Sequence, residues 1–155
     1  MGLAVLARKF GRLAGIPARR RWLLAEALLS LAIARIWLLV APFRRVAAQL
    51  GELTSVDTPA PDAPRSGPEV AEIGWAVRRA ADHAPFRAVC LQQAIAAKLM
   101  LRRRGVGSVL HLGVARGGPD GMQAHAWLDS GGVAVTGYPV EPHYVELARW
   151  GEPSR

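Results

Sequence analysis

The sequence predicts an α+β domain, because two helical patterns are followed by strand patterns in the second half of the chain. Apolar residues recur at roughly helical spacing over residues 68–85, with Pro68 near the start. Residues 87–104 are rich in the helix formers Ala, Leu, Gln and Met, and Gly105 supplies a stop. This second helix carries the only cysteine of the chain, Cys90, close to its start.

Sequence patterns typical of β-strands follow Gly105. Apolar residues alternate with other residues in the segment 108–117, which predicts a strand with one apolar face. Residues 123–129 and 133–137 predict two more strands around a Ser-Gly-Gly turn, and together they form a hairpin. The sheet is therefore expected to be antiparallel.

The first fifty residues contain a long apolar segment that raises the question of a membrane. We expect a short basic amphipathic helix at 2–14 and a long helix at about 20–40, with a further helical segment after Pro42. Glu26 and Arg35 interrupt the long helix, lie about 180° apart around its axis, and would each cost roughly 2–3 kcal/mol near a bilayer centre. A buried or interfacial helix is therefore expected, and a membrane span or a signal peptide are the alternatives.

Residues 54–69 are rich in proline, with serine, aspartate and glycine, and they predict a linker without a core of its own. This linker divides the chain into a helical N-terminal extension, residues 1–53, and a mixed core, residues 70–155. A chain of 155 residues is long enough for one domain with a modest core.

The composition narrows the classes of function. The net charge is +8, from 20 basic and 12 acidic residues, and all but two of the basic residues are arginine. This excess suits an anionic partner, although a GC-rich genome would produce the same composition. A single cysteine allows no internal disulfide and no multi-cysteine zinc site, so a cytoplasmic protein is expected. We find no metal or nucleotide motif and expect no cofactor.

Cys90 and His125 together suggest nucleophilic catalysis. Helix N-termini and nearby imidazolium groups lower the pKa of a thiol, and Cys90 lies in the first turn of its predicted helix. His125 lies on a predicted strand, where an imidazole facing the helix start could act as a general base. The alternative is that Cys90 is a small buried apolar residue, which is the usual role of a lone cysteine.

Several motifs in this order resemble the leader peptidase of lasso-peptide biosynthesis, a transglutaminase-like cysteine peptidase found as the stand-alone C-terminal half of the lasso-peptide B protein. The resemblance covers most of the chain. The motifs are Pro42 to Arg45, Cys90-Leu91, Arg103-Arg104-Gly105, Leu110 to Val114, and Ala124 to Asp129. The resemblance implies a papain/transglutaminase-like fold, removal of a leader from a ribosomally made precursor, Cys90 as nucleophile, and His125 as general base and acid.

The third catalytic group departs from that family, which has an aspartate on the strand after the histidine. A two-residue turn at Ser130-Gly131 would place Thr136 opposite His125, and a slip by one residue would place Tyr138 there. None of the candidates, Thr136, Gly137 and Tyr138, is acidic. An uncharged group such as the Thr136 hydroxyl, or a backbone carbonyl, could still orient the imidazole.

Two acidic residues near the hairpin are poor substitutes for that aspartate. Asp129 lies about 13 Å along the strand from His125. Glu141 would reach only if the chain turned back after Pro139.

The partners that the resemblance implies are the precursor peptide, a separate leader-recognition protein and the cyclase of the same pathway. The N-terminal helices could also contact a membrane surface. The competing class is a non-catalytic basic adaptor that binds an acidic peptide or a membrane, and nucleic acid is not expected as a partner. We expect His111 at the surface or rim of the sheet, and the Arg-rich end of the helix at 102–104 to be solvated or to contact an acidic leader.

Overall fold

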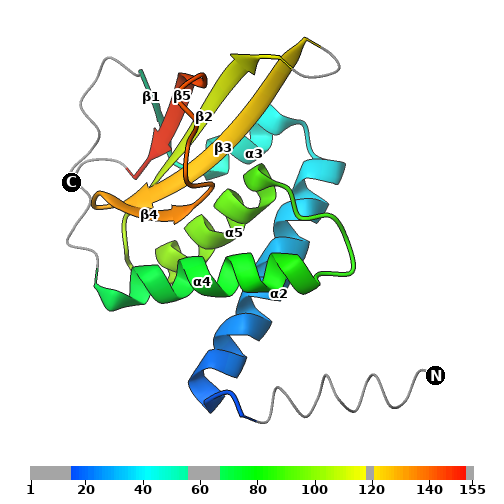
Figure 1. The fold of residues 1–155 in the computed structure, drawn as a ribbon, viewed down its shortest axis with the longest axis vertical. Coiled ribbons are helices and arrows are strands. Elements are labelled where there is room, and N and C mark those ends of the chain that lie inside the picture. Colours follow the sequence, from blue (N-terminus) through cyan, green and yellow to red (C-terminus); the bar gives the residue numbers. More distant parts are fainter. Residues whose placement is uncertain (1–14, 56–66, 118–120, 153–155) are drawn as a thin grey trace.

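The computed structural model describes residues 15–55, 67–117 and 121–152, and the helix predicted at 2–14 lies outside this part of the chain. The α+β architecture is confirmed, because helices pack on an antiparallel sheet whose strands follow the order β1-β5-β2-β3-β4 (Figure 1). The helices are α2 (Ala18–Val40), α3 (Phe43–Gln49), α4 (Pro68–His83) and α5 (Cys90–Arg103). The strands are β1 (Glu52–Thr54), β2 (Val109–Arg116), β3 (Met122–Ser130), β4 (Val133–Thr136) and β5 (Val145–Gly151).

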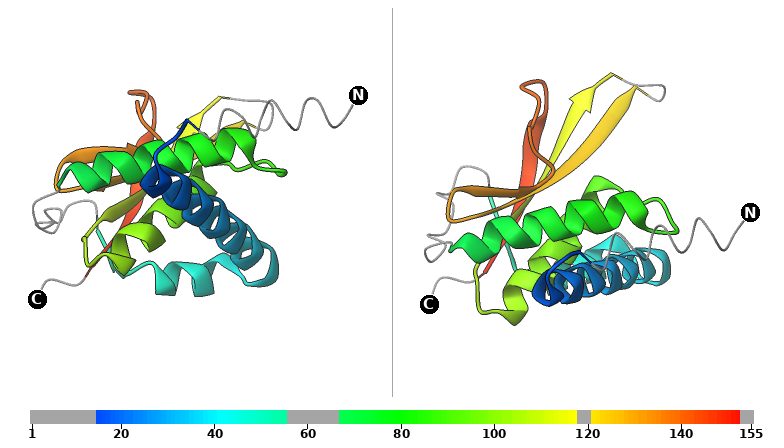
Figure 2. Two further views of the ribbon diagram at one scale, coloured as in Figure 1. Left: turned by 90° about the horizontal axis from the view of Figure 1, so that it is seen from below. Right: turned by 60° about the horizontal axis from the view of Figure 1, so that its bottom comes forward.

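The hydrophobic core lies between the helices and one face of the sheet. Helices α2, α4 and α5 gather on one side of the strands (Figure 2). On this side, Leu110 of β2 lies opposite Leu128 of β3, and both are fully buried. Ala126 also points to this side, because side chains two apart on a strand share a face. His125 and Trp127 therefore belong to the opposite face of the sheet.

The N-terminal helix α2 takes part in the same core as α4 and α5. Leu23, Ala27, Leu31 and Ala34 recur at helical spacing and are buried against the other helices. The division between an extension and a separate C-terminal core stays a prediction. Most of the predicted linker lies outside the described residues, because residues 56–66 are not among them.

The arginines at the end of α5 are not free in solvent, which corrects the prediction for 102–104. Arg104 forms a two-pronged contact with Glu26 of α2, with Nη1–Oε1 and Nη2–Oε2 distances of 2.9 and 2.6 Å. Arg103 bonds Glu26 and Ser30 of the same helix. Arg102 donates to the carbonyl of Gln49. These side chains tie α2 and the end of α3 to the end of α5.

Helix α2 is long and apolar enough to cross a membrane, and it is the one such helix in the described part of the chain. Length and apolarity are weak evidence, because core helices and signal sequences meet the same test. Only 22% of its most apolar stretch is buried inside the protein. The helix therefore has a buried face and an open face.

Candidate active site

Cys90 is the first residue of α5, which confirms its predicted position in the first turn. The helix begins here because Val89 is extended, with φ −77° and ψ 168°, and cannot continue the helical hydrogen bonding backward. The side-chain oxygen of Gln92 accepts the N–H of Val89 at 3.3 Å, and the Gln93 side chain donates to the carbonyl of Ala88 at 2.9 Å. Both contacts fix the approach of the chain to the cysteine.

The backbone N–H groups of the first helical turn have no acceptor within the helix. The first N–H with a carbonyl four residues earlier is that of Gln93, which reaches Val89 at 3.1 Å. The N–H groups of residues 90, 91 and 92 therefore point away from the helix body and carry its positive dipole end. Cys90 is half-buried and packs against the hydrophobic core.

His125 lies in the middle of β3, directly opposite Gly113 of β2. Its ring stacks on that of Trp127, with centroids 6.0 Å apart and an interplanar angle of 22°. The centroid of the Tyr144 ring lies 5.2 Å from that of His125, and the two rings are tilted by 39°. His125 and Trp127 thus share a face of the sheet, as the alternation in the sequence predicts.

The partner of His125 is a backbone carbonyl. The Nε2 atom lies 2.7 Å from the carbonyl oxygen of Gly137, so one of the three candidate positions supplies the orienting group, through its main chain. Gly137 has φ +79°, and a Cβ there would overlap the carbonyl oxygen of Ala126 and lie 2.8 Å from Cα of Trp127. Only glycine fits this conformation and this close approach to β3 without strain.

The prediction that Thr136 lies opposite His125 is wrong. Ser130 pairs with Val133 across a two-residue turn at Gly131 and Gly132, both with positive φ. The register then shifts, and Thr136 faces Leu128. The shift is a bulge near Val135, which the turn rules do not reveal. Thr136 is buried on the core side of the sheet, and its hydroxyl has no hydrogen-bond partner within the part of the chain that the structure describes.

Cys90 and His125 each have the expected local setting, but among the described residues no hydrogen bond joins them. Helix α5 contacts β3, the strand of His125. The neighbours of His125 on that strand, Ala126 and Leu128, point into the core that α5 covers. The imidazole itself belongs to the other face. A working pair would need the His125 ring and the thiol to approach each other when substrate binds.

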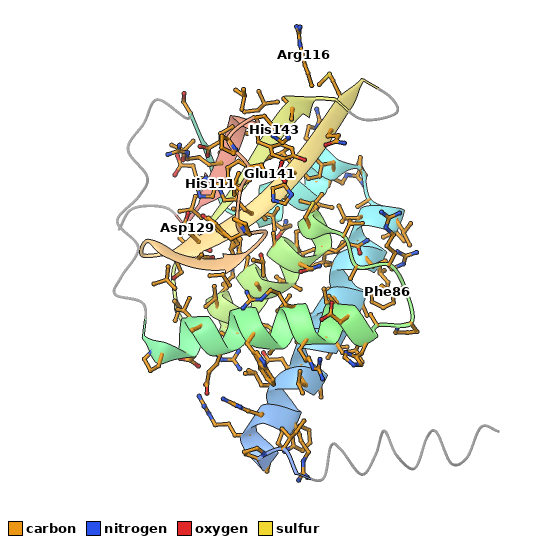
Figure 3. The ribbon with its side chains drawn as sticks, in the orientation of Figure 1. Phe86, His111, Arg116, Asp129, Glu141 and His143 are labelled. Atoms are coloured by element: carbon orange, nitrogen blue, oxygen red, sulfur yellow. The ribbon has the colours of Figure 1, made fainter. Side chains whose placement is uncertain are left out.

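Beside this pair lies a buried ion cluster that the sequence did not reveal. His111 is only 6% exposed, so the expectation of a surface or rim position is wrong. Its Nε2 lies 2.6 Å from Asp129 and its Nδ1 lies 2.6 Å from Glu146, and Figure 3 shows His111 and Asp129 together over the sheet. Arg149 pairs with Glu146 at 2.9 Å. The His111 ring is parallel to that of Trp127, with centroids 5.4 Å apart.

The cluster shifts the pKa of its members. Burial lowers the pKa of His111, but hydrogen bonds and the negative charges of Asp129 and Glu146 outweigh burial and raise it above the ordinary value. Burial raises the pKa of Glu146, but Arg149 and His111 more than reverse this and lower it. Burial, aided by the same two carboxylates, raises the pKa of Tyr138 to about 12.

The two acidic residues considered as substitutes are engaged elsewhere. Asp129 binds His111 and not His125. This agrees with the expectation that Asp129 lies too far along the strand to reach His125. Glu141 pairs with His143 at 3.2 Å on the surface (Figure 3). Among the described residues no group of three or more His, Cys, Asp or Glu side chains is arranged to hold a metal ion.

The comparison with protein families gives one match. A model described as the Transglutaminase-like superfamily matches residues 37–149, a segment that begins in α2, ends in β5 and contains both Cys90 and His125. No curated protein and no solved structure matches the chain. Since the matched segment covers well over half of the chain and the α+β fold agrees, this protein belongs to the transglutaminase-like superfamily.

Proposed function

We propose that this protein is a cysteine peptidase that removes the leader peptide from a lasso-peptide precursor through an acyl-enzyme on Cys90. The observation that carries the proposal is the 2.7 Å contact between His125 Nε2 and the Gly137 carbonyl, on a chain whose one cysteine opens a helix. Cysteine peptidases and acyl transferases occur within the superfamily. The peptidase activity and the substrate are both parts of the proposal.

The carbonyl of Gly137 determines which nitrogen of His125 can act as a base. A carbonyl oxygen only accepts hydrogen bonds, so Nε2 must carry the proton in this contact. In the neutral ring, Nδ1 then holds the free lone pair. Nδ1 is therefore the nitrogen that takes the thiol proton, and Gly137 does the orienting work that an asparagine does in papain-like enzymes.

The reaction follows from these two groups. The Cys90 thiol passes its proton to His125 Nδ1, and the thiolate attacks the carbonyl carbon of the scissile peptide bond. The free N–H groups of the first α5 turn stabilise the oxyanion of the tetrahedral intermediate. His125 returns the proton to the leaving amine, which leaves a thioester on Cys90. Water then attacks the thioester, releases the new carboxyl end of the leader and restores the thiol.

The choice of substrate rests on the resemblance of the motifs around Cys90 and His125 to lasso-peptide leader peptidases. The partners proposed with it are the precursor peptide, a separate leader-recognition protein and the cyclase that receives the freed core amine. The net charge of +8 suits an acidic leader segment. Cytoplasmic action agrees with a free thiol as nucleophile.

A second candidate function is a non-catalytic basic adaptor. It is favoured by one observation, the lack of a hydrogen bond between Cys90 and His125 in the described residues. Catalytic hydrogen bonds often lengthen in the absence of substrate, so this observation does not decide between the two functions. Substituting Cys90 decides between them, because an adaptor does not need the thiol.

The first test is the reactivity of the thiol. We expect iodoacetamide to alkylate Cys90 readily at neutral pH, and the rate of alkylation to fall in His125→Ala. His83→Ala is the matched control, because His83 is an exposed histidine whose ring bonds the carbonyl of Arg79 within its own helix. Negligible alkylation at every pH at which the fold persists would favour the adaptor.

The second test is cleavage itself. Purified protein is incubated with a lasso-type precursor peptide and the proposed leader-recognition protein, and the products are identified by mass spectrometry. We expect two fragments from one peptide bond, none with Cys90→Ala, and a trapped acyl-enzyme on acid quenching. A Cys90 thiol that iodoacetamide alkylates readily, without any cleavage of the precursor, would support Cys90 as the nucleophile and reject this substrate class.

A further inference from the structure

The two faces of α2 differ, and the boundary between them is marked by its charges. At about 100° per residue, Glu26 and Arg35 fall on opposite edges of the buried stripe that includes Leu23, Leu31 and Ala34. Both charges turn toward the protein. Glu26 binds Arg103 and Arg104, while the Arg35 guanidinium reaches the carbonyl of Arg87 at 3.4 Å and lies over the ring of Phe86.

The outward face of α2 is apolar along its length. Its large side chains are all exposed, between 40% and 76%, and no charged residue stands among them. They are Trp22, Leu28, Leu29, Ile36, Leu39 and Val40. Scattered apolar side chains are normal on a protein surface, but a continuous stripe on one helix marks an interaction surface.

Exposed arginines stand at both ends of this stripe. Arg21 is at one end, and Arg44 and Arg45 of α3 are at the other. Trp22 lies at the first end, in the position where an amphipathic ring suits the boundary between lipid headgroups and acyl chains. A helix with an apolar face and a basic margin is the pattern of helices that lie in a membrane interface.

We propose that α2 docks lengthwise on an anionic phospholipid surface, with its outward face in the headgroup region. The helix has 23 residues and is about 34 Å long, so its whole face can lie flat on the membrane. It does not span the bilayer in this arrangement, because its other face remains in the protein core and Glu26 stays paired. This surface does not include Cys90, and its docking would place the proposed peptidase at a membrane.

Charge favours lipid over a second copy of the chain. In a twofold-symmetric pair with two α2 helices face to face and antiparallel, Arg21 of one copy would meet Arg44 and Arg45 of the other. Like charges would then oppose each other at both ends of the stripe. Phosphate groups of an anionic bilayer would instead neutralise all of them.

The test is flotation of the purified full chain with vesicles of phosphatidylcholine alone and with added phosphatidylglycerol. We expect binding to the mixed vesicles and little binding to the neutral ones. The double variant Leu29→Gln/Ile36→Gln should bind more than about tenfold more weakly, since both side chains lie on the outward face. Arg44→Glu/Arg45→Glu should lose a comparable share of binding.

The matched control is Leu53→Gln/Leu147→Gln, which changes two exposed leucines on the sheet and should bind like the wild type. Equal binding by Leu29→Gln/Ile36→Gln, or no binding to the mixed vesicles, would overturn the proposal. So would a concentration-dependent dimer that this double variant abolishes, because the occupant would then be a second copy. Cys90→Ala should bind vesicles normally, which separates this result from the fate of the peptidase proposal.

Discussion

His111 and His125 lie on the same face of the sheet and both rings stack on that of Trp127, yet their surroundings differ in charge. His111 is buried and bonded through both nitrogens to carboxylates. His125 is half-buried and bonded through one nitrogen to a neutral carbonyl. Two carboxylates favour the charged imidazolium, whereas one carbonyl fixes a tautomer and leaves the other nitrogen free.

This difference gives His111 a structural role and leaves His125 able to act as a base. An imidazolium held between two acids has no lone pair with which to take a proton. A neutral imidazole whose N–H donates to a carbonyl still has a lone pair on its other nitrogen. The sheet thus presents the same side chain twice, and the identity of the partner atom decides which of the two can act as a base.

The largest contrast is expected in activity. His125→Ala should lower kcat/KM for precursor cleavage by about 10²–10⁴-fold, the usual contribution of a general base. Its stability to urea should fall only modestly, because the half-buried ring loses one hydrogen bond and its contacts with the rings of Trp127 and Tyr144. Equal loss of activity in a folded His111→Gln variant would show that the two histidines are not divided in this way.

Gly137 should be the next most sensitive position. Gly137→Ala forces a side chain into positive φ and against β3, so we expect a loss of about 2–3 kcal/mol of unfolding free energy and slower alkylation of Cys90. Gly132→Ala is the control, because it has φ +77° but open space around its Cβ position. If the two variants unfold alike, the close approach to β3 is not what requires glycine.

His111 should matter for stability. His111→Gln leaves Asp129 and Glu146 without their shared cation, and we expect a loss of about 2 kcal/mol, below the value for fully buried pairs because both carboxylates are partly exposed. The comparison is His143→Gln, whose ion pair with Glu141 is exposed and should be worth less than about 1 kcal/mol. Urea unfolding measures both.

The smallest effect should be a dependence of stability on pH. The pKa of His111 is raised in the folded state, so its contribution is complete below about pH 6.5 and is lost as the pH rises through the folded value. Glu146 has a lowered pKa, so its contribution is complete above about pH 4.5 and is lost as the pH falls. Unfolding free energy measured against pH should decline on the alkaline side in the wild type, and this decline should be absent in His111→Gln.

The local features of the fold could be predicted from the sequence, whereas the long-range contacts could not. The helix with Cys90 near its start follows from composition and a glycine stop, and its predicted range differs from α5 by three residues at the start and one at the end. The hairpin follows from its turn. Strands β1 and β5 were not predicted, since β1 has three residues and β5 has a register shift that interrupts its alternation.

The surroundings of the candidate site show the same limit. The partners of His111 come from residues 18 and 35 positions further along the chain, so no local pattern marks it as buried. Thr136 was placed wrongly because a bulge, unlike a turn, has no residue signature here. The backbone carbonyl that bonds His125 could be foreseen only as one of several options, because every residue has a backbone carbonyl and no sequence pattern marks this one.

The contact between Glu26 and Arg104 has a consequence for synthesis of the chain. The two residues are 78 positions apart, so at about 5–20 residues per second the ribosome needs roughly 4–16 s to supply the arginine after the glutamate. During that interval both sides of α2 are without their final partners. The emerging helix is then at its most apolar, and any factor that sorts nascent chains by hydrophobicity meets it before the rest of the protein can cover its inner side.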